Sequence, residues 1–114
     1  MDMNIDSGEY IDIDAALSRI GGNMGLYKKL LGRFIEGEHF EKLYNALQIG
    51  DTEEAARQAH SLKGVSANLS LVKVQSSALD LEQKLKNNLD YSEDLDEFKR
   101  VFDITLEKIT EIVS

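Results

Sequence analysis

The amino-acid sequence predicts an all-α fold: an antiparallel four-helix bundle with a short extra helix at the N-terminus. The chain has 114 residues and no proline, so it lacks the residue that most strongly interrupts helices. Segments rich in Val, Ile and Thr with alternating polarity, which are typical of strands, are also missing. Apolar residues instead recur every three or four positions along four long segments with short connections. Such segments bury their apolar faces most economically against one another.

The first expected helix is short, and the segment after it is long. Asp12 can cap the first helix, and the glycines at 21–22 can end it. Asn23 can cap the second helix, which continues or restarts after Gly37 and closes at Gly50. The apolar residues of this long segment at helical spacing are Tyr27, Leu30, Leu31, Phe34, Ile35, Phe40, Leu43, Tyr44 and Leu47.

Three further helices complete the predicted bundle. Asp51 followed by Glu54 is similar to a capping box, and it starts a helix that contains His60 and ends at about residue 67 or 68. The next helix has a single apolar stripe, formed by Leu71, Val74, Ala78, Leu81 and Leu85. The last helix is expected to begin at Ser92 and to bury Leu95, Phe98, Phe102, Leu106, Ile109 and Val113.

Length, charge and cysteine content exclude several classes of function. The chain fits one domain, and we expect a flexible lead-in at residues 1–10 and a bundle domain at 11–114. The absence of cysteine excludes disulfides, zinc ribbons and thiol nucleophiles. A net charge of −8 argues against nucleic acid and anionic membranes as partners. With no long apolar run and an acidic N-terminus, we expect a cytoplasmic protein, monomeric and without membrane insertion, whose partners are proteins.

The helix around His60 presents the histidine to solvent. At about 100° per residue, Leu62 and Leu69 fall nearly opposite His60, so the ring points away from the core. Within about 60° of it lie three small residues and two cationic ones. They are Ala56, Arg57, Lys63, Gly64 and Ala67. The whole chain is strongly negative, whereas the charged residues of this patch are both positive. We therefore take the patch as the candidate functional site.

The same patch has the properties needed for covalent phosphoryl transfer. An imidazole with a pKa of about 6.5 is largely unprotonated near neutral pH and can form a covalent intermediate. Lys63 can place an ammonium group beside an anion attached to His60. A glycine inside a helix costs roughly 1 kcal/mol relative to alanine, so we interpret Gly64 as leaving room for the incoming group. The sequence has no glycine-rich phosphate loop and no kinase signature, so we expect no cofactor, and any Mg²⁺ should come with the partner.

The segment AHSLKGVSANLSL, residues 59–71, resembles the core motif of histidine-containing phosphotransfer (HPt) domains. The pattern His-x-Leu-Lys-Gly is present as His60, Leu62, Lys63 and Gly64, and residues 16–36 are also similar to the first part of that family's bundle. The resemblance covers residues 10–113. It implies a phosphorelay carrier that takes a phosphoryl group on His60 from a phospho-aspartyl receiver domain, or a hybrid kinase that contains one, and passes it to another receiver.

Two positions outside the motif matter to this resemblance. Family members often have glycine where this chain has Ser70, and Ser70 can serve the same turn by capping the next helix. The family often has a Gln or Glu on the following helix that faces the histidine, and Glu82 is the candidate here. Arg57 has two interpretations, as part of the contact surface or as an ordinary solvated side chain.

Other functions remain open on the sequence. One is the histidine-bearing domain of a chemotaxis-type kinase, which a separate ATP-binding domain phosphorylates; no such domain follows within these residues, which favours the relay carrier. Another is an adaptor that binds a receiver without exchanging phosphate, although the intact His60 and Lys63 argue against it. A metal or haem bundle would need inward-facing ligands. His39 lies among glutamates at 36–41 but lacks a complete ligand set, so we expect no metal site.

Overall fold

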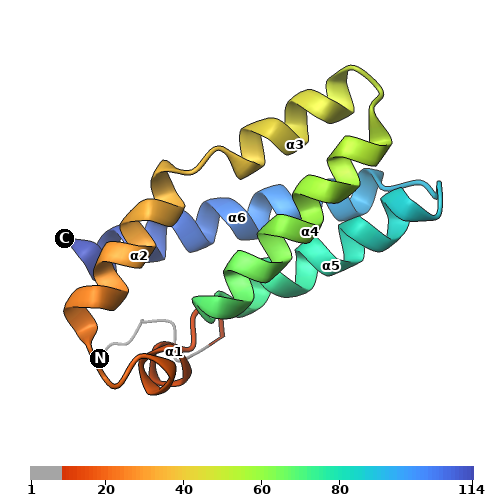
Figure 1. Ribbon diagram of the computed structural model, residues 1–114. Coiled ribbons are helices and arrows are strands. Elements are labelled where there is room, and N and C mark those ends of the chain that lie inside the picture. Colours follow the sequence, from red (N-terminus) through yellow and green to blue (C-terminus); the bar gives the residue numbers. More distant parts are fainter. Residues whose placement is uncertain (1–8) are drawn as a thin grey trace.

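The computed structural model describes residues 9–114, and this part of the chain is all-helical, as predicted (Figure 1). Its helices are α1 (Ile13–Arg19), α2 (Met24–Glu36), α3 (His39–Gln48), α4 (Thr52–Asn68), α5 (Val72–Lys86) and α6 (Ser92–Val113). Within residues 9–114, none of these helices is both long enough and apolar enough to cross a bilayer. Residues 1–8, which make up most of the predicted lead-in, lie outside the described residues.

Side-chain caps start three of the helices where the sequence predicted them. The carboxylate of Asp12 accepts a hydrogen bond from the backbone N–H of Ala15 at 3.1 Å, and the Asn23 side chain accepts one from Leu26 at 3.0 Å. The Asp51 carboxylate does the same for Glu54 at 3.1 Å. These bonds satisfy backbone donors that the first turn of a helix leaves free. Left-handed glycines end the preceding segments, at Gly21, Gly22 and Gly50.

The long second segment restarts rather than continues, because the helix breaks at residues 37–38. α2 ends at Glu36 and α3 begins at His39. The backbones of the two pieces have different neighbours: α3 lies along α4, whereas α2 lies along α6, although the Phe40 ring of α3 also reaches α6. Ile35, which was expected on the apolar face, is 39 % exposed just before the break. The break therefore turns α2 away from α4 at the lower left of the bundle in Figure 1.

The core fixes which face of α4 is exposed. Ala55, Ala59, Leu62 and Ser66 of α4 are buried, and Leu62 lies on the face that the helical wheel placed opposite His60. Burial of Leu62 by itself contributes roughly 1.5–3 kcal/mol, so rotation of α4 about its axis would be costly. Elsewhere in the core, an aromatic cluster joins α2 and α3 to α6, and its members are Phe34, Phe40, Phe98 and Phe102.

The turn between α4 and α5 differs from the prediction that Ser70 caps α5. The N-cap position of α5 is held by Leu71, without a side-chain hydrogen bond. Ser70 instead takes a left-handed φ of 57° and ends α4: its N–H bonds the Ala67 carbonyl, and the N–H of Leu71 bonds that of Ser66. This is a Schellman ending, which needs a left-handed residue at the position of Ser70. The predicted cap was wrong because the backbone of Ser70 serves the preceding helix.

The N-terminal segment holds this turn in place. The Asp12 N–H donates to the Ser70 carbonyl at 2.9 Å, and the Val72 N–H donates to the Tyr10 carbonyl at 2.8 Å. Arg19 adds a hydrogen bond of 2.9 Å to the Ser70 hydroxyl. Tyr10, the last residue of the predicted lead-in, is therefore attached to the bundle. These bonds fix how α5 follows α4, and so fix which residues of α5 face His60.

Candidate functional site

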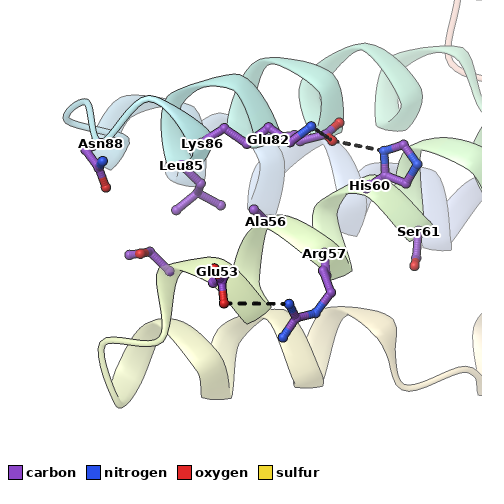
Figure 2. A pocket seen from close by; sticks show the side chains of 10 residues that line it. Glu53, Ala56, Arg57, His60, Ser61, Glu82, Leu85, Lys86 and Asn88 are labelled. Carbon is purple, nitrogen blue, oxygen red and sulfur yellow. Dashed lines mark hydrogen bonds and ion pairs between the residues drawn. The ribbon is translucent and has the colours of Figure 1, made fainter.

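His60 stands on the exposed face of α4, as the sequence predicted. Its side chain is 64 % exposed, while Leu62 on the opposite face is 1 % exposed. Among residues 9–114 the ring makes one polar contact: Nδ1 lies 2.9 Å from Oε2 of Glu82 on α5 (Figure 2). No residue among 9–114 hydrogen-bonds Nε2. The ring is therefore held at one nitrogen and open at the other.

Glu82 is a buried carboxylate with several cationic neighbours. Its side chain is only 3 % exposed. Lys63 on α4 contacts Oε1 at 3.1 Å, and Lys86, one turn along α5, contacts Oε2 at 3.1 Å. Burial raises the pKa of Glu82, but the interactions with Lys63, Lys86 and His60 together outweigh it, so the pKa lies below its usual value. Glu82 is thus ionised at neutral pH.

An ionised Glu82 sets the tautomer of His60. A carboxylate can only accept hydrogen bonds, so Nδ1 of the imidazole must be the donor in this contact. In a neutral ring the proton on Nδ1 leaves the lone pair on Nε2. Nε2 is also the solvent-facing nitrogen without a partner in the described chain. The site can therefore supply a fixed, unprotonated ring nitrogen to an electrophile that approaches from outside.

A cavity of about 690 Å³ lies beside His60, between α4 and α5 (Figure 2). Ala56 and Leu85 give it apolar surface, and Glu53, Arg57 and Lys86 surround them. Ala56 was predicted to share the outward face with His60, but it is only 7 % exposed. The prediction erred because α5 packs alongside α4 and covers this flank. Ala56 is small enough to leave the hollow open.

The other predicted residues occupy different parts of the face. Arg57 lines the cavity, and its guanidinium pairs with Glu53 at 3.9 Å (Figure 2). It also pairs with Glu54 at 2.8 Å. Ala67 is half-buried two turns beyond His60. Gly64 is exposed, and a Cβ added there would meet no atom within 4 Å. The structure therefore brings together His60, Lys63 and Glu82, and leaves open space over Gly64.

Lys86 is a member of the cluster that sequence reasoning missed. It contacts Glu82, lines the cavity beside His60 and is 62 % exposed. Its spacing of four residues from Glu82 places the two on one face of a helix, which is a readable signal. This spacing indicates a role for Lys86 at the site only because Glu82 itself faces His60.

His39 lies apart from this cluster, at the start of α3. Among residues 9–114, no three His, Cys, Asp or Glu side chains gather in an arrangement that could hold a metal ion. The candidate site is accordingly a histidine with a buried carboxylate and two lysines.

Comparison with known families assigns the chain to one of them. The model of the Hpt domain family matches residues 30–111, which is most of the chain. The chain belongs to the Hpt domain family, whose members carry out histidine phosphotransfer in two-component signalling and interact with receiver domains and kinases. No curated protein and no solved structure gave a significant match in the same comparisons.

Replacing Gly64 by leucine separates folding from access to His60. We expect Gly64→Leu to fold and to raise the unfolding midpoint, since leucine favours a helix interior by close to 1 kcal/mol over glycine and the site is open. Phosphoryl transfer to His60 should slow by roughly tenfold or more, because the branched side chain stands one turn from the ring and displaces an approaching partner. Thermal unfolding and transfer rates from a phosphorylated receiver measure the two effects.

The matched control for this substitution is Gly64→Ala. It gains similar helix stability but adds only a methyl group, which has no atom within 4 Å, so its transfer rate should stay close to wild type. Wild-type transfer by Gly64→Leu would show that open space over this glycine has no role.

Proposed function

We propose that this chain is a phosphorelay carrier that accepts a phosphoryl group on Nε2 of His60 from the phospho-aspartate of one receiver domain and returns it to the aspartate of another. The observation that carries the proposal is the pairing of Nδ1 with the buried Glu82, while Nε2 faces solvent. The scaffold is an antiparallel four-helix bundle in which α2 and α3 together take the place of one helix.

The transfer step needs only groups that the two partners supply. The lone pair on Nε2 attacks phosphorus in line with the bond to the aspartyl oxygen. The N–P bond forms as the P–O bond breaks, and the released electron pair leaves on the partner's carboxylate. The ring then carries a positive charge with its proton still on Nδ1, facing the Glu82 carboxylate, which stabilises it. Mg²⁺ on the receiver stabilises the transferring oxygens.

Lys63 and Lys86 provide the positive charge that a phosphorylated His60 requires. Both ammonium groups lie 3.1 Å from the Glu82 carboxylate. With a neutral ring, the two lysines and one carboxylate leave one positive charge in excess. A phosphoryl group on Nε2 brings negative charge to the same place, and flexible lysine side chains can share it. The charge excess favours the loaded state without a bound metal in this chain.

A labelling experiment with two phosphate sources tests the proposal against the kinase-domain alternative. We expect the chain to acquire acid-labile, base-stable phosphate from at least one member of a panel of phosphorylated receivers, because the site has a nucleophile but no nucleotide-binding loop. Labelling only by ATP with a separate kinase domain would favour the chemotaxis-type function. Binding to receivers without any labelling would make the chain an adaptor.

A further inference from the structure

Lys86 contacts the same oxygen atom of Glu82 that binds His60. Nδ1 of the ring lies 2.9 Å from Oε2 of Glu82, and Nζ of Lys86 lies 3.1 Å from that oxygen (Figure 2). Lys63 contacts the other oxygen, Oε1, at 3.1 Å. A carboxylate oxygen can accept more than one hydrogen bond, so Nδ1 and Nζ can occupy Oε2 together. Lys86 therefore acts on the ring through one shared atom.

The ring of His60 depends on this oxygen for its orientation. The side chain of His60 is mostly exposed, so packing against the bundle restrains it little. The side chain of Glu82 is buried, and each of its oxygens faces an ammonium group. Lys86 lies four residues after Glu82, one turn along α5, so their contact forms within one helix and does not depend on the ring. Oε2 is accordingly held in place whether or not the ring binds to it.

The charge of Lys86 also affects how many protons the ring carries. A buried carboxylate beside an imidazole favours the doubly protonated ring, which is a cation without a free lone pair on Nε2. An ammonium group opposes this effect. Nζ and Nδ1 are no more than about 6 Å apart, since each lies about 3 Å from Oε2, and two charges at that separation interact appreciably in a partly buried site. Lys86 thus favours the neutral ring, which is the form that can attack phosphorus.

The other charged side chains that contact this pair or line its cavity belong to α4. Lys63 contacts Oε1 of the carboxylate. Arg57 lines the cavity, but its guanidinium is paired with Glu53 and Glu54. Two ammonium groups therefore surround one carboxylate, and the ring faces a net positive charge. Removal of Lys86 leaves one ammonium group and one carboxylate, so the net charge that faces the ring falls to zero.

We propose that Lys86 is a positioning residue for phosphoryl transfer: by sharing Oε2 of Glu82 with Nδ1, it keeps the unphosphorylated ring of His60 oriented and singly protonated. This role sets the lowest pH at which the chain accepts phosphate. The inference rests on the proposed function and adds a step to it. It concerns the ring before phosphate arrives, whereas compensation of the phosphoryl charge by the two lysines concerns the loaded ring.

The pH dependence of transfer to Lys86→Met tests this role. The probe is a receiver domain charged with acetyl phosphate, chosen from a panel as the one that labels wild-type chain fastest, and used at saturating concentration. Lys86→Met should accept phosphate roughly 3- to 10-fold more slowly than wild type at about pH 6, and at a similar rate at about pH 8.5, because the carboxylate then favours the second ring proton. The ratio of the two rates cancels the pH dependence of the receiver itself.

Two further variants serve as controls. Lys86→Arg retains the positive charge, and its rates should stay within about twofold of wild type at both pH values. Lys84→Met removes the same charge elsewhere on α5, where Lys84 pairs with Asp94 at 2.7 Å, and its ratio to wild type should not change with pH. A ratio for Lys86→Met that is the same at both pH values would overturn the role of Lys86, whether or not the rate is reduced.

Nitrogen-15 NMR of the unphosphorylated chain gives a readout that needs no receiver. The His60 ring should gain its second proton at a higher pH in Lys86→Met than in wild type, whereas His39, at the start of α3, should behave identically in both. Identical titration of His60 in the two proteins would also overturn the role of Lys86. Absence of label on the wild type would instead overturn the proposed function, and the NMR comparison would still be interpretable.

Discussion

His60→Gln is expected to reduce receiver-dependent phosphate on the chain to background while leaving the fold intact. The side chain is 64 % exposed, so the substitution removes little buried surface, and stability should change by less than about 0.5 kcal/mol. The glutamine amide can still donate to Glu82, which keeps the buried carboxylate partnered. What it lacks is a nucleophilic ring nitrogen. The measurement is acid-labile, base-stable label after incubation with a phosphorylated receiver.

The chain supplies its own control for this experiment, because it has only two histidines. His39→Gln at saturating receiver should keep wild-type labelling, since His39 stands at the start of α3, away from the cluster around Glu82. If the label survives in His60→Gln and disappears in His39→Gln, then His39 is the phosphorylated residue and the proposal for His60 is refuted.

Glu82→Ala should slow transfer to His60 at saturating receiver by about 10- to 100-fold, the size of effect expected when a reacting group loses its alignment. Without the carboxylate, nothing holds the proton on Nδ1, and the ring can rotate and populate the tautomer that has no lone pair on Nε2. Lys63 and Lys86 also lose the partner that lies 3.1 Å from each of them. Rates at saturating receiver and the unfolding midpoint report the two consequences.

Glu82→Gln separates orientation from charge. The amide oxygen can still accept from Nδ1, so part of the transfer rate should return, although the negative charge that stabilises a phosphorylated ring is gone. Asp80→Ala, an exposed carboxylate on the same helix, controls for the change in net charge and should transfer normally. Equal rates for Glu82→Ala and Glu82→Gln would mean that Glu82 acts only through its charge.

Much of the fold could be predicted because its signals are local. The caps at Asp12, Asn23 and Asp51 each involve residues three apart in the sequence, and all three form as expected. The wheel of α4 predicted the exposure of His60, since 3.6 residues per turn fixes which side chains oppose the buried Leu62. At Gly37 the sequence left open whether the second helix continues or restarts. The prediction for Ser70 was wrong because this residue ends α4, which leaves Leu71 at the N-cap position of α5.

The sequence by itself determined that the chain forms amphipathic helices and that one of them presents a histidine, a lysine and a glycine to solvent. These properties depend on side chains within one or two turns of each other. The family resemblance named Glu82 as a candidate, but only the tertiary structure decided that this residue, 22 positions beyond His60, meets Nδ1. Tertiary structure also decided that Lys86 joins the cluster and that a groove opens between α2 and α4. The contacts of Glu82 and Lys86 depend on how the turn at Ser70 orients α5 against α4. The groove depends on the break at residues 37–38, where α2 ends and α3 begins. The spacing of apolar residues along one helix predicts which face is buried, but it does not predict how the next helix packs against it.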